Sequence, residues 1–545
     1  MNKQTLSEWN EDWLAKGQPG RRTDFNEALI PHRILSHHTT IPPGQIFWGG
    51  GVMSLSDLNG HFFTLGASRV GKSQLMNIEI NCVIRAVEAA RRAKTRTQLD
   101  RAFLIDTKGD AIDVLEGRGV EYILYNPSDS RSWDWDIAKD HTTPSSLFDL
   151  ACAIIPQGRE SNPFWTDAAR AILAGCFITL KYSFGDDWNL GDAIILCLFP
   201  MEDLIEYLLK CPGNSFLVNR LREIVESDDT KLIANLGITL FANLAKLMPA
   251  AANSQRAKRR FTLSAFLNHP EILVIVPDQE ALETVVPIFH ALMARMTKML
   301  ASRPDTNQNR TYIFLDELSF LGRIPHFDQL VTFTASKGVH VHAATQGIGR
   351  MRQFYGDKPL NDILDCFGWK TILRTQDPDA ALWAASLFGT KGEWVETPNM
   401  GEYGYQKQWM QRPQVTNYNI MQELPFASAS HGVTGYFLPG SSPSNHHAAP
   451  YKATIDAPTI SLLNPRLNGK RFARQETKGF NEQLLDETLF LAEHRRVVEA
   501  AAPSGDNDWE EKIVQAFREE LRPHIQRLFA RAFNEEMGEQ MEGNY

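Results

Sequence analysis

Short apolar runs recur along the chain, and most of them end in polar or turn-forming residues. We expect strands at 61–65, 102–110, 271–279, 311–317, 339–346 and 370–376. Helical composition follows several of these runs, as in the segment directly after residue 73. Strands that alternate with helices predict an α/β fold with a mostly parallel sheet covered on both faces.

The pattern changes between about residues 145 and 268, where strand-like runs become scarce. Leu, Ala and Asn dominate there, as in LIANLGITLFANLAKLM. This composition predicts an all-α domain at 146–268, inserted into an α/β nucleotide-binding domain formed by 61–145 and 269–465. Residues 1–60 form an N-terminal segment without clear periodicity, and 466–545 are predicted to be a helical tail.

The sequence of this tail predicts an amphipathic helix at 508–537. It opens with a capping box of Asp508 and Glu511. Its apolar face carries Val514, Phe517, Leu521, Ile525, Leu528 and Ala532. Acidic and basic residues alternate on the polar face, which suits a protein partner better than an anionic lipid surface. Docking on a partner and packing back onto the α/β domain both remain open.

Composition narrows the class of protein. With 545 residues, 43% hydrophobic and 22% charged, the chain is a globular protein of several domains. Its net charge of −9 requires any contact with DNA to be local. The six cysteines form no C-x-x-C pair, so neither zinc nor a disulfide framework is indicated. We find no signal-peptide core. The stretch that comes nearest to a membrane span, AARAILAGCFITLKYSF, is broken by Arg170 and Lys181. We therefore expect a cytoplasmic protein without a membrane span.

The strongest chemical signal is the phosphate-binding motif GASRVGKS, which lies between a predicted strand and a predicted helix. It consists of Gly66, Ala67, Ser68, Arg69, Val70, Gly71, Lys72 and Ser73. Its backbone N–H groups can surround phosphates, and Lys72 can reach the β- and γ-phosphates of ATP. The Ser73 hydroxyl can bind Mg²⁺.

A second motif, FLDE, ends the predicted strand at 311–317. Asp316 is positioned to hold Mg²⁺, and Glu317 to orient or deprotonate the attacking water. Gln346 ends the next strand and could contact the γ-phosphate or that water. Spacing alone leaves Gln346 equally compatible with a surface residue.

Further segments carry a family resemblance. HFFTLGASRVGKSQ, FLIDTKGD, LYNPSDSRSWDWD, NPFWTDAARAIL, TYIFLDELSFLG and KGVHVHAATQGIGRMRQFYG occur in this order. The series resembles the TraD/TraG family of coupling proteins of conjugation and type IV secretion, over roughly residues 45–460. The resemblance implies a RecA-like P-loop motor that forms a homo-hexameric ring around DNA and hydrolyses ATP with Mg²⁺. It also implies an all-α insertion and a sensor role for Gln346. Its substrate would be DNA or a relaxase–DNA complex, delivered to a secretion channel.

The chain departs from this family in two ways. Family members usually begin with transmembrane helices, and we expect none here, so a membrane-bound or secretion-system protein would have to recruit this one to the inner membrane. Two alternatives to a coupling protein of secretion remain. One is a soluble hexameric DNA-translocating ATPase in DNA processing or defence, and the other is a docking adaptor without motor activity. The segment TASKG also lacks an arginine that some members place there, which leaves Arg350, Arg352 and Arg374 as candidates for a trans-acting arginine.

Overall fold

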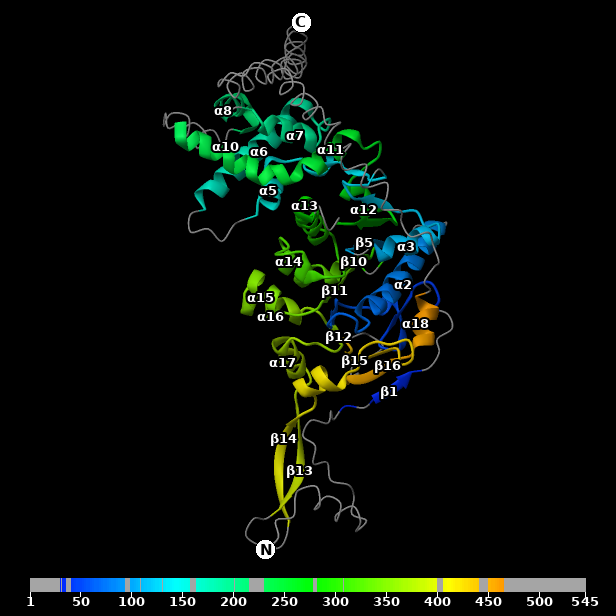
Figure 1. Ribbon diagram of the computed structural model, residues 1–545. Coiled ribbons are helices and arrows are strands. Elements are labelled where there is room, and N and C mark those ends of the chain that lie inside the picture. The colour runs from blue at the N-terminus through cyan, green and yellow to red at the C-terminus, as the bar shows by residue number, and fades with distance from the viewer. Residues whose placement is uncertain are drawn as a thin grey trace, which may run out of the picture. The chain divides into compact units, whose positions relative to one another are not determined.

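In the computed structural model, the described residues are 30, 32–35, 41–93, 99–107, 109–129, 131–156, 163–199, 201–214, 230–277, 282–306, 308–398, 405–440 and 449–464. The chain divides into two compact units. The first comprises Met1–Glu79, Glu317–Phe320 and His342–Pro465. The second comprises Ile80–Asp316, Leu321–Val341 and Arg466–Tyr545. Figure 1 shows the elements of both units.

The first unit contains a mixed set of six strands. Their order is β1 (His32–Leu35), β16 (Tyr451–Ile455), β15 (Val433–Leu438), β12 (Trp369–Ile372), β4 (Phe62–Leu65) and β11 (Val339–Thr345), of which His342–Thr345 belong to this unit. β4 pairs in parallel with β11 and with β12, whereas β15 is antiparallel to both of its neighbours. The loop after β4 therefore emerges at the edge where β11 and β12 also end.

Two hairpins stand apart from these strands. They are β2 (Gln45–Trp48) with β3 (Gly51–Ser54), and β13 (Thr390–Pro398) with β14 (Tyr405–Pro413). The remaining elements of the unit are η1 (Leu55–Asp57), η4 (Leu318–Phe320), α15 (Gly349–Tyr355), α16 (Asp357–Asp365), α17 (Pro378–Ser386), the π-helix η6 (Asn419–Glu423) and α18 (Ala457–Leu463).

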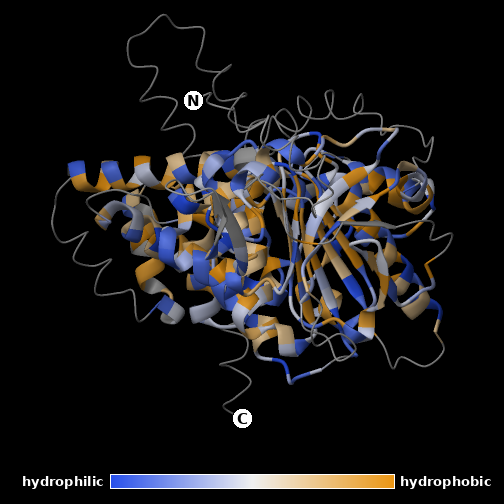
Figure 2. Cartoon of the chain, turned by 90° about the horizontal axis from the view of Figure 1, so that it is seen from below, coloured by the Kyte–Doolittle hydropathy of each residue, from blue (hydrophilic) through white to orange (hydrophobic). Residues whose placement is uncertain are grey.

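The second unit has four parallel strands beside a large helical region. The strands are β10 (Thr311–Leu315), β5 (Arg101–Ile105), β9 (Ile272–Ile275) and β6 (Ile123–Tyr125). Two-residue strands β7 (Asp134–Trp135) and β8 (Arg260–Phe261) pair in parallel. Strands β4, β5, β9 and β10 are largely apolar, whereas many helices carry both hydrophobic and hydrophilic residues (Figure 2).

Helix α2 (Lys72–Arg92) is divided between the units: its residues up to Glu79 belong to the first unit, and the rest belong to the second. Beside the strands lie α3 (Asp110–Gly117), α4 (Ile137–Asp140), α12 (Leu263–Asn268), α13 (Leu282–Ala301), α14 (Phe327–Phe333) and η5 (Ala335–Lys337). The intervening helical region comprises α5 (Pro144–Ile154), α6 (Phe164–Phe184), α7 (Leu190–Cys197), α8 (Met201–Lys210), η2 (Pro212–Asn214), α10 (Thr230–Leu244), η3 (Ala245–Leu247) and α11 (Met248–Arg256).

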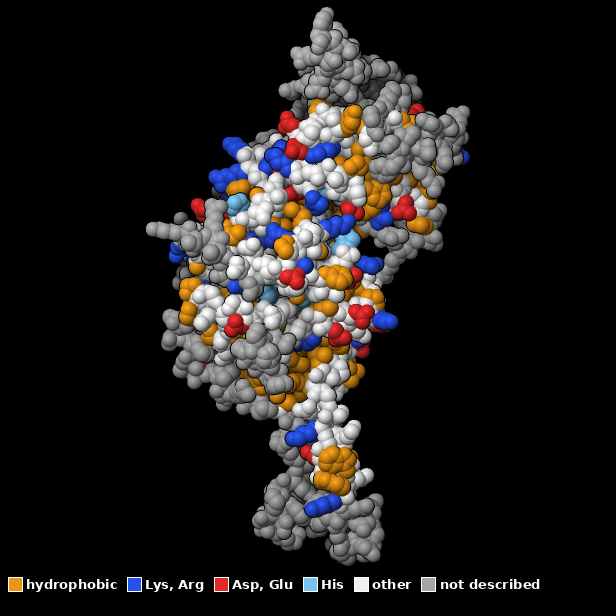
Figure 3. All heavy atoms as spheres, turned by 180° about the vertical axis from the view of Figure 1, so that it is seen from behind, with side chains coloured by type: hydrophobic (Ala, Val, Ile, Leu, Met, Phe, Trp, Pro, Cys, Tyr) orange, Lys and Arg blue, Asp and Glu red, His pale blue; other side chains and the backbone are white. Residues whose placement is uncertain are grey.

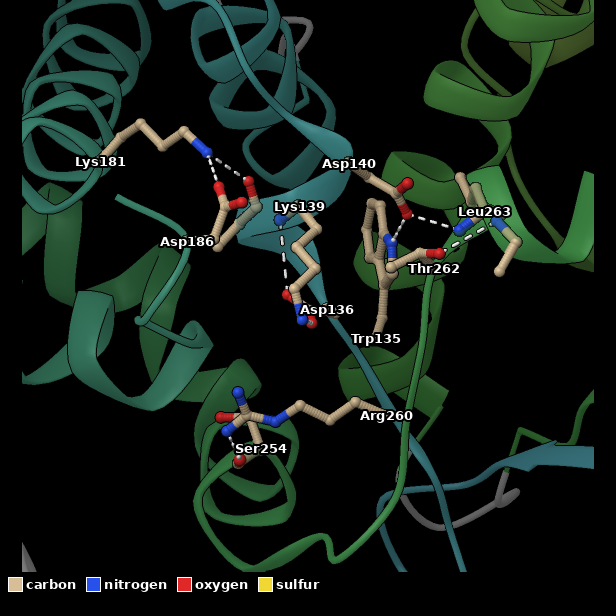
Figure 4. Close-up of polar contacts among 12 residues, drawn as sticks. Trp135, Asp136, Lys139, Asp140, Lys181, Asp186, Ser254, Arg260, Thr262 and Leu263 are labelled. Atoms are coloured by element: carbon tan, nitrogen blue, oxygen red, sulfur yellow. Dashed lines mark hydrogen bonds and ion pairs between the residues drawn. The ribbon is translucent and has the colours of Figure 1, made fainter. Parts of the chain in front are cut away.

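The buried carboxylate of Asp140 fastens the two ends of this helical region together (Figure 4). Its oxygens accept hydrogen bonds from Trp135 Nε1 at 2.7 Å, from Leu263 N at 2.6 Å and from Ser264 N at 3.2 Å. Residues that precede the helical region and residues that come after it are therefore held by one side chain.

All six predicted strands are present, and the described residues between 144 and 256 contain helices and no strand. The α/β class with a mostly parallel sheet is confirmed. The domain boundaries remain predictions, and the predicted helix at 508–537 lies outside the described residues.

One stretch among the described residues, Lys231–Gln255, is long and apolar enough to cross a membrane by length and composition, with a mean hydropathy of 1.4. It is not the stretch that the sequence had singled out. A single stretch of this kind is weak evidence for a span, because core helices also meet the same criterion.

Candidate nucleotide-binding site

The GASRVGKS loop connects β4 to α2 within the first unit. Gly66 N donates to Thr345 O at 3.1 Å, and Ala67 N donates to Arg374 O at 2.8 Å. The loop is thus tied to the ends of β11 and β12, the two strands on either side of β4. This strand, loop and helix order is the context that a phosphate-binding loop requires.

Two residues of the loop have a left-handed backbone. Gly71 has φ +96°, and a Cβ there would lie 2.2 Å from Val433 Cγ2, so this position requires glycine. Arg69 has φ +65°, which is uncommon for a residue with a side chain. Such local strain is frequent at ligand-binding turns.

Lys72 of the loop forms an ion pair with Glu317. Lys72 Nζ lies 2.8 Å from Glu317 Oε2, and the two side chains are 6% and 15% exposed. The structure thus brings together the two residues that the sequence assigned to phosphate binding and to water activation.

The other carboxylate oxygen of Glu317 is held by three donors. Oε1 accepts hydrogen bonds from Ser319 Oγ at 2.5 Å, from Thr345 Oγ1 at 3.2 Å and from Gln346 N at 3.2 Å. Burial raises the pKa of Glu317, but the charge of Lys72 and these hydrogen bonds outweigh it, and the pKa lies below its ordinary value. Glu317 is therefore ionised at neutral pH.

Gln346 links this carboxylate to the phosphate loop. Its backbone N–H donates to Glu317, while its side-chain Oε1 accepts a hydrogen bond from Ser68 Oγ at 3.1 Å. A residue that contacts both the loop and Glu317 is positioned to respond to what the loop binds. Gln346 is exposed, as the surface-residue interpretation expects, and its role as a sensor remains a prediction.

Asp316 precedes Glu317 but belongs to the second unit. Thr107 Oγ1 lies 3.5 Å from Asp316 Oδ2 in that unit. The described residues contain no group of three or more His, Cys, Asp or Glu side chains that could hold a metal ion by themselves. A hydroxyl and a carboxylate, as in Ser73 and Asp316, are the hard oxygen ligands that suit Mg²⁺ bound together with phosphates. Their joint role in metal binding remains a prediction.

The segment from the π-helix η6 to Ala427 lies against the loop and against Arg374, which follows β12. Arg374 Nη1 donates to Gln422 O at 3.0 Å and to Leu424 O at 2.8 Å, and its guanidinium lies 4.7 Å from the Phe426 ring centroid. Ala427 N donates to Arg69 O at 3.2 Å. π-Helical turns are frequent at functional sites. No local sequence pattern indicated this connection, because its residues lie far apart along the chain.

The three candidate trans-acting arginines differ in their surroundings. Arg352 pairs with Asp357 at 3.4 Å and with Asp379 at 3.5 Å. Arg374 is committed to two backbone carbonyls of its own chain. Arg350 is exposed and has no ion pair or hydrogen bond from its side chain to another described residue.

The basic clusters at 85–96 and 256–260 and the tryptophans of SWDWD are each compatible, from the sequence, with contact to DNA or with a structural role. Arg91 donates to Pro270 O and Glu121 O and pairs with Glu271 at 2.8 Å, so it fastens α2 to neighbouring loops. Trp135 is buried, and the Arg259 guanidinium lies 5.5 Å from the Trp133 ring. For Arg91 and Trp135 the structural interpretation holds.

A strand, a glycine-containing loop and a helix, with the loop lysine paired to an acidic residue from another strand end, define a P-loop nucleotide-binding protein of the α/β class. Comparisons with known proteins agree with this class. Residues 49–422 match the family model described as the type IV secretion-system coupling protein DNA-binding domain. The chain belongs to this family of coupling proteins.

Relatives within this family are distant. The coupling protein TraD of Escherichia coli (strain K12) is 21% identical over 345 residues, which is 61% of this chain and 46% of TraD. The chain thus matches about half the length of that relative.

Among solved structures, the unbound conjugative coupling protein TrwBdeltaN70 is 18% identical, with a TM-score of 0.60, over 77% of this chain and 90% of that chain. TrwB with ADP and Mg²⁺ is 18% identical, with a TM-score of 0.57, over 81% and 93%. The resemblance in fold confirms the RecA-like P-loop class.

Proposed function

We propose that this chain is an ATP-hydrolysing motor that moves DNA as the coupling protein of a conjugative type IV secretion system. The observation that carries the proposal is the Lys72–Glu317 ion pair at the phosphate loop, with Gln346 bound to both Glu317 and Ser68. Family membership supplies the setting of DNA transfer. Solved TrwB structures contain ADP with Mg²⁺ or an ATP analogue, which supports the same nucleotide here.

The ion pair between Lys72 and Glu317 provides a switch between ATP binding and ATP hydrolysis. Phosphates entering the loop compete with Glu317 for the Lys72 ammonium. Once Lys72 turns to the phosphates, Glu317 Oε2 becomes available to water, while Oε1 stays held by Ser319, Thr345 and Gln346. Loss of the lysine charge also raises the pKa of Glu317, which makes the carboxylate a better proton acceptor.

The metal would be held by Ser73 and Asp316 together with the phosphates. Mg²⁺ supplies neutralisation of charge on the phosphate oxygens. The residues of the chain supply the rest: the loop amides orient the phosphates, and Glu317 orients the water. An adaptor without motor activity would have no need of this paired lysine and glutamate.

DNA as partner and a hexameric ring are inferred from the family. A motor of this kind binds its nucleotide between subunits, so ATP should promote assembly. We place the protein in the cytoplasm, free or held at the inner membrane by a partner protein. The alternative of a soluble DNA-processing motor shares the same site and differs in its partners.

The test compares two variants of the site. Lys72→Ala should abolish tight ATP binding, because the phosphates lose their principal cation. Glu317→Gln should bind ATP normally but hydrolyse it at least about 100-fold more slowly, because water loses its proton acceptor. Binding is measured with a fluorescent ATP analogue, and hydrolysis by phosphate release with and without DNA.

Glu88→Gln is the matched control, since Glu88 lies in α2 beyond the loop and pairs with the exposed Arg92. It should retain wild-type hydrolysis. Wild-type turnover by Glu317→Gln would refute the role of Glu317, and a wild-type chain without DNA-stimulated hydrolysis would refute the motor.

A further inference from the structure

An exposed aromatic side chain lies directly beside the phosphate loop. Phe426 is 46% exposed. The backbone N–H of the next residue, Ala427, donates to Arg69 O of the loop at 3.2 Å. Phe426, Ala427 and the loop all belong to the first unit. The position of the ring relative to the loop is therefore defined by a backbone contact one residue away.

Exposure by itself does not mark this ring as a binding site. Hydrophobic side chains are dispersed among polar and charged ones on the face of the molecule seen in Figure 3. Single exposed apolar residues are normal on folded proteins. Phe426 differs from them in how its ring is held and in the side of the loop on which it lies.

Arg374 covers the Phe426 ring and connects it to the loop. The guanidinium lies 4.7 Å from the ring centroid, within the range of a cation–π contact. Arg374 Nη1 is itself held by Gln422 O at 3.0 Å and by Leu424 O at 2.8 Å. The backbone of Arg374 accepts a hydrogen bond from Ala67 N of the loop at 2.8 Å. A fixed cation thus supports the ring, and nearly half of the side chain remains open to solvent.

The segment that follows Phe426 is held against the loop at a second point. Val433 Cγ2 would lie 2.2 Å from a Cβ placed on Gly71, so the start of β15 packs directly on the loop. Between the two contact points the chain turns tightly, with Ser428 N donating to Gly432 O at 3.2 Å and Gly432 N to Ser428 O at 2.9 Å. The surroundings of Phe426 are therefore fixed on both sides.

The two sides of the phosphate loop differ in what they present. β11 and β12 pair with β4 from opposite sides. Gln346 follows β11 and contacts Ser68 and Glu317. Arg374 follows β12 and contacts Phe426. In the proposed function the γ-phosphate meets the attacking water at Glu317. Because a nucleotide carries its base at the end opposite to the γ-phosphate, the base extends away from Glu317, toward the β12 side.

The chemistry of an exposed phenyl ring suits a nucleobase. Every base has a flat π-face, and stacking on an aromatic side chain is independent of charge and tolerant of base identity. The phosphates are already provided for by the loop amides and Lys72. The ring therefore lies where the nucleoside part of the ligand needs a contact that the loop does not supply.

We propose that Phe426 stacks on the base of the bound nucleotide and that Arg374 positions the ring. The proposal deepens the proposed function and rests on it, because it takes the nucleotide at the loop from there. Phe426 contributes affinity for the nucleoside part of ATP and leaves the phosphates to the loop.

The experiment compares a ligand that has a base with one that lacks it. Isothermal titration calorimetry with Mg²⁺ measures the Kd of a non-hydrolysable ATP analogue and of inorganic tripolyphosphate. Phe426→Ala should weaken binding of the analogue at least about fivefold and leave binding of tripolyphosphate unchanged. Phe426→Tyr, which keeps the ring, should bind both ligands as the wild type does. The matched control is Leu462→Ala, which shortens another exposed apolar side chain of the same unit and should change neither Kd.

A second variant covers the case in which Phe426→Ala fails to fold. In Phe426→Trp the emission added by the new indole should fall when the ATP analogue binds and should persist with tripolyphosphate. Unchanged affinity of Phe426→Ala for the analogue, an equal loss for both ligands, or emission of Phe426→Trp that does not respond to the analogue would each overturn the stacking. In all three cases the wild type still binds nucleotide and the proposed function stands. A wild type that fails to bind the analogue would instead remove the proposed function.

Discussion

A buried carboxyl–imidazole pair connects α2, the helix after the phosphate loop, to β11, the strand that precedes Gln346. His342 Nδ1 and Glu79 Oε2 are 2.7 Å apart, and the Phe62 ring stacks on the imidazole at 4.3 Å. Burial raises the pKa of Glu79 to about 8 and lowers the pKa of His342 to about 3. Both groups are therefore neutral near pH 7, and the pair is a hydrogen bond between a carboxylic acid and a neutral imidazole.

This pair predicts a pH dependence of stability. Between pH 6.5 and 8 the folded chain keeps the Glu79 proton that an unfolded chain has released, so the free energy of unfolding falls as pH rises, by up to about 2 kcal/mol. Below pH 6.5 the depressed pKa of His342 acts in the opposite direction and cancels this slope down to about pH 4.5. Glu79→Gln should remove the contribution of this pair to the fall above pH 6.5, while the smaller contribution of Asp134, whose pKa burial raises to about 7, remains.

Thermal midpoints of the two proteins, compared at pH 6.5, 7.2 and 8.0, measure the effect. The difference between wild type and variant should change across this window, while Glu88→Gln on the same helix should leave the wild-type profile unchanged. Parallel curves for wild type and Glu79→Gln would show that Glu79 is ionised in the folded chain.

Single residues were predictable from the sequence where a motif fixes them. Lys72 and Glu317 belong to motifs whose residue types and spacing indicate their chemical roles, and the two side chains form an ion pair in the structure. Thr345 and Ser319 were missed, although each is within two residues of a predicted site residue. Arg374 could not be found in its actual role, because its partners are backbone carbonyls about 50 residues further along the chain.

At the scale of the elements, the junction between the two ends of the helical region depends on the hydrogen bonds that Asp140 accepts. Asp140→Ala leaves the buried donors of Trp135 and Leu263 without an acceptor, and should destabilise the second unit by about 3 kcal/mol. Asp140→Asn keeps the volume and part of the acceptor capacity, so a smaller loss of about 2 kcal/mol is expected. Urea unfolding followed by helical circular dichroism gives the two values.

Asp186→Asn is the control for this prediction, because Asp186 is an exposed ion-pair partner of Lys181 in the same region (Figure 4). Its effect should stay within about 0.5 kcal/mol. Equal effects of the Asp140 and Asp186 variants would mean that the junction does not depend on the buried carboxylate.

Elements with a core face were predictable, and those without one were not. β4, β5, β9, β10 and β11 are uniformly buried, and their apolar runs stand out in the sequence. The β13–β14 hairpin was not predicted, because its strands alternate charged, polar and aromatic residues. β1 was missed for another reason: its partner β16 lies more than 400 residues away, at His32↔Lys452, and no local pattern reports such a pairing.

For the whole molecule, the sequence established the class of protein through the order of its motifs. The division into an α/β nucleotide-binding domain with a helical insertion remains a prediction; the described residues between 144 and 256 contain helices and no strand. The family match ends at residue 422 and the described residues end at 464. The C-terminal residues 466–545 therefore need an experiment of their own.

The segment 508–537 provides that experiment. Its apolar stripe and mixed-charge polar face predict docking on a protein partner. Deleting residues 505–545 should leave DNA-stimulated ATP hydrolysis within about twofold of the full chain, because the motor motifs precede the segment, and should abolish DNA transfer between cells. Phe517→Ser in the stripe should reproduce the loss of transfer, whereas Glu519→Ser on the polar face should have little effect. A truncated protein that aggregates or loses ATP hydrolysis would instead assign the stripe to packing within the chain.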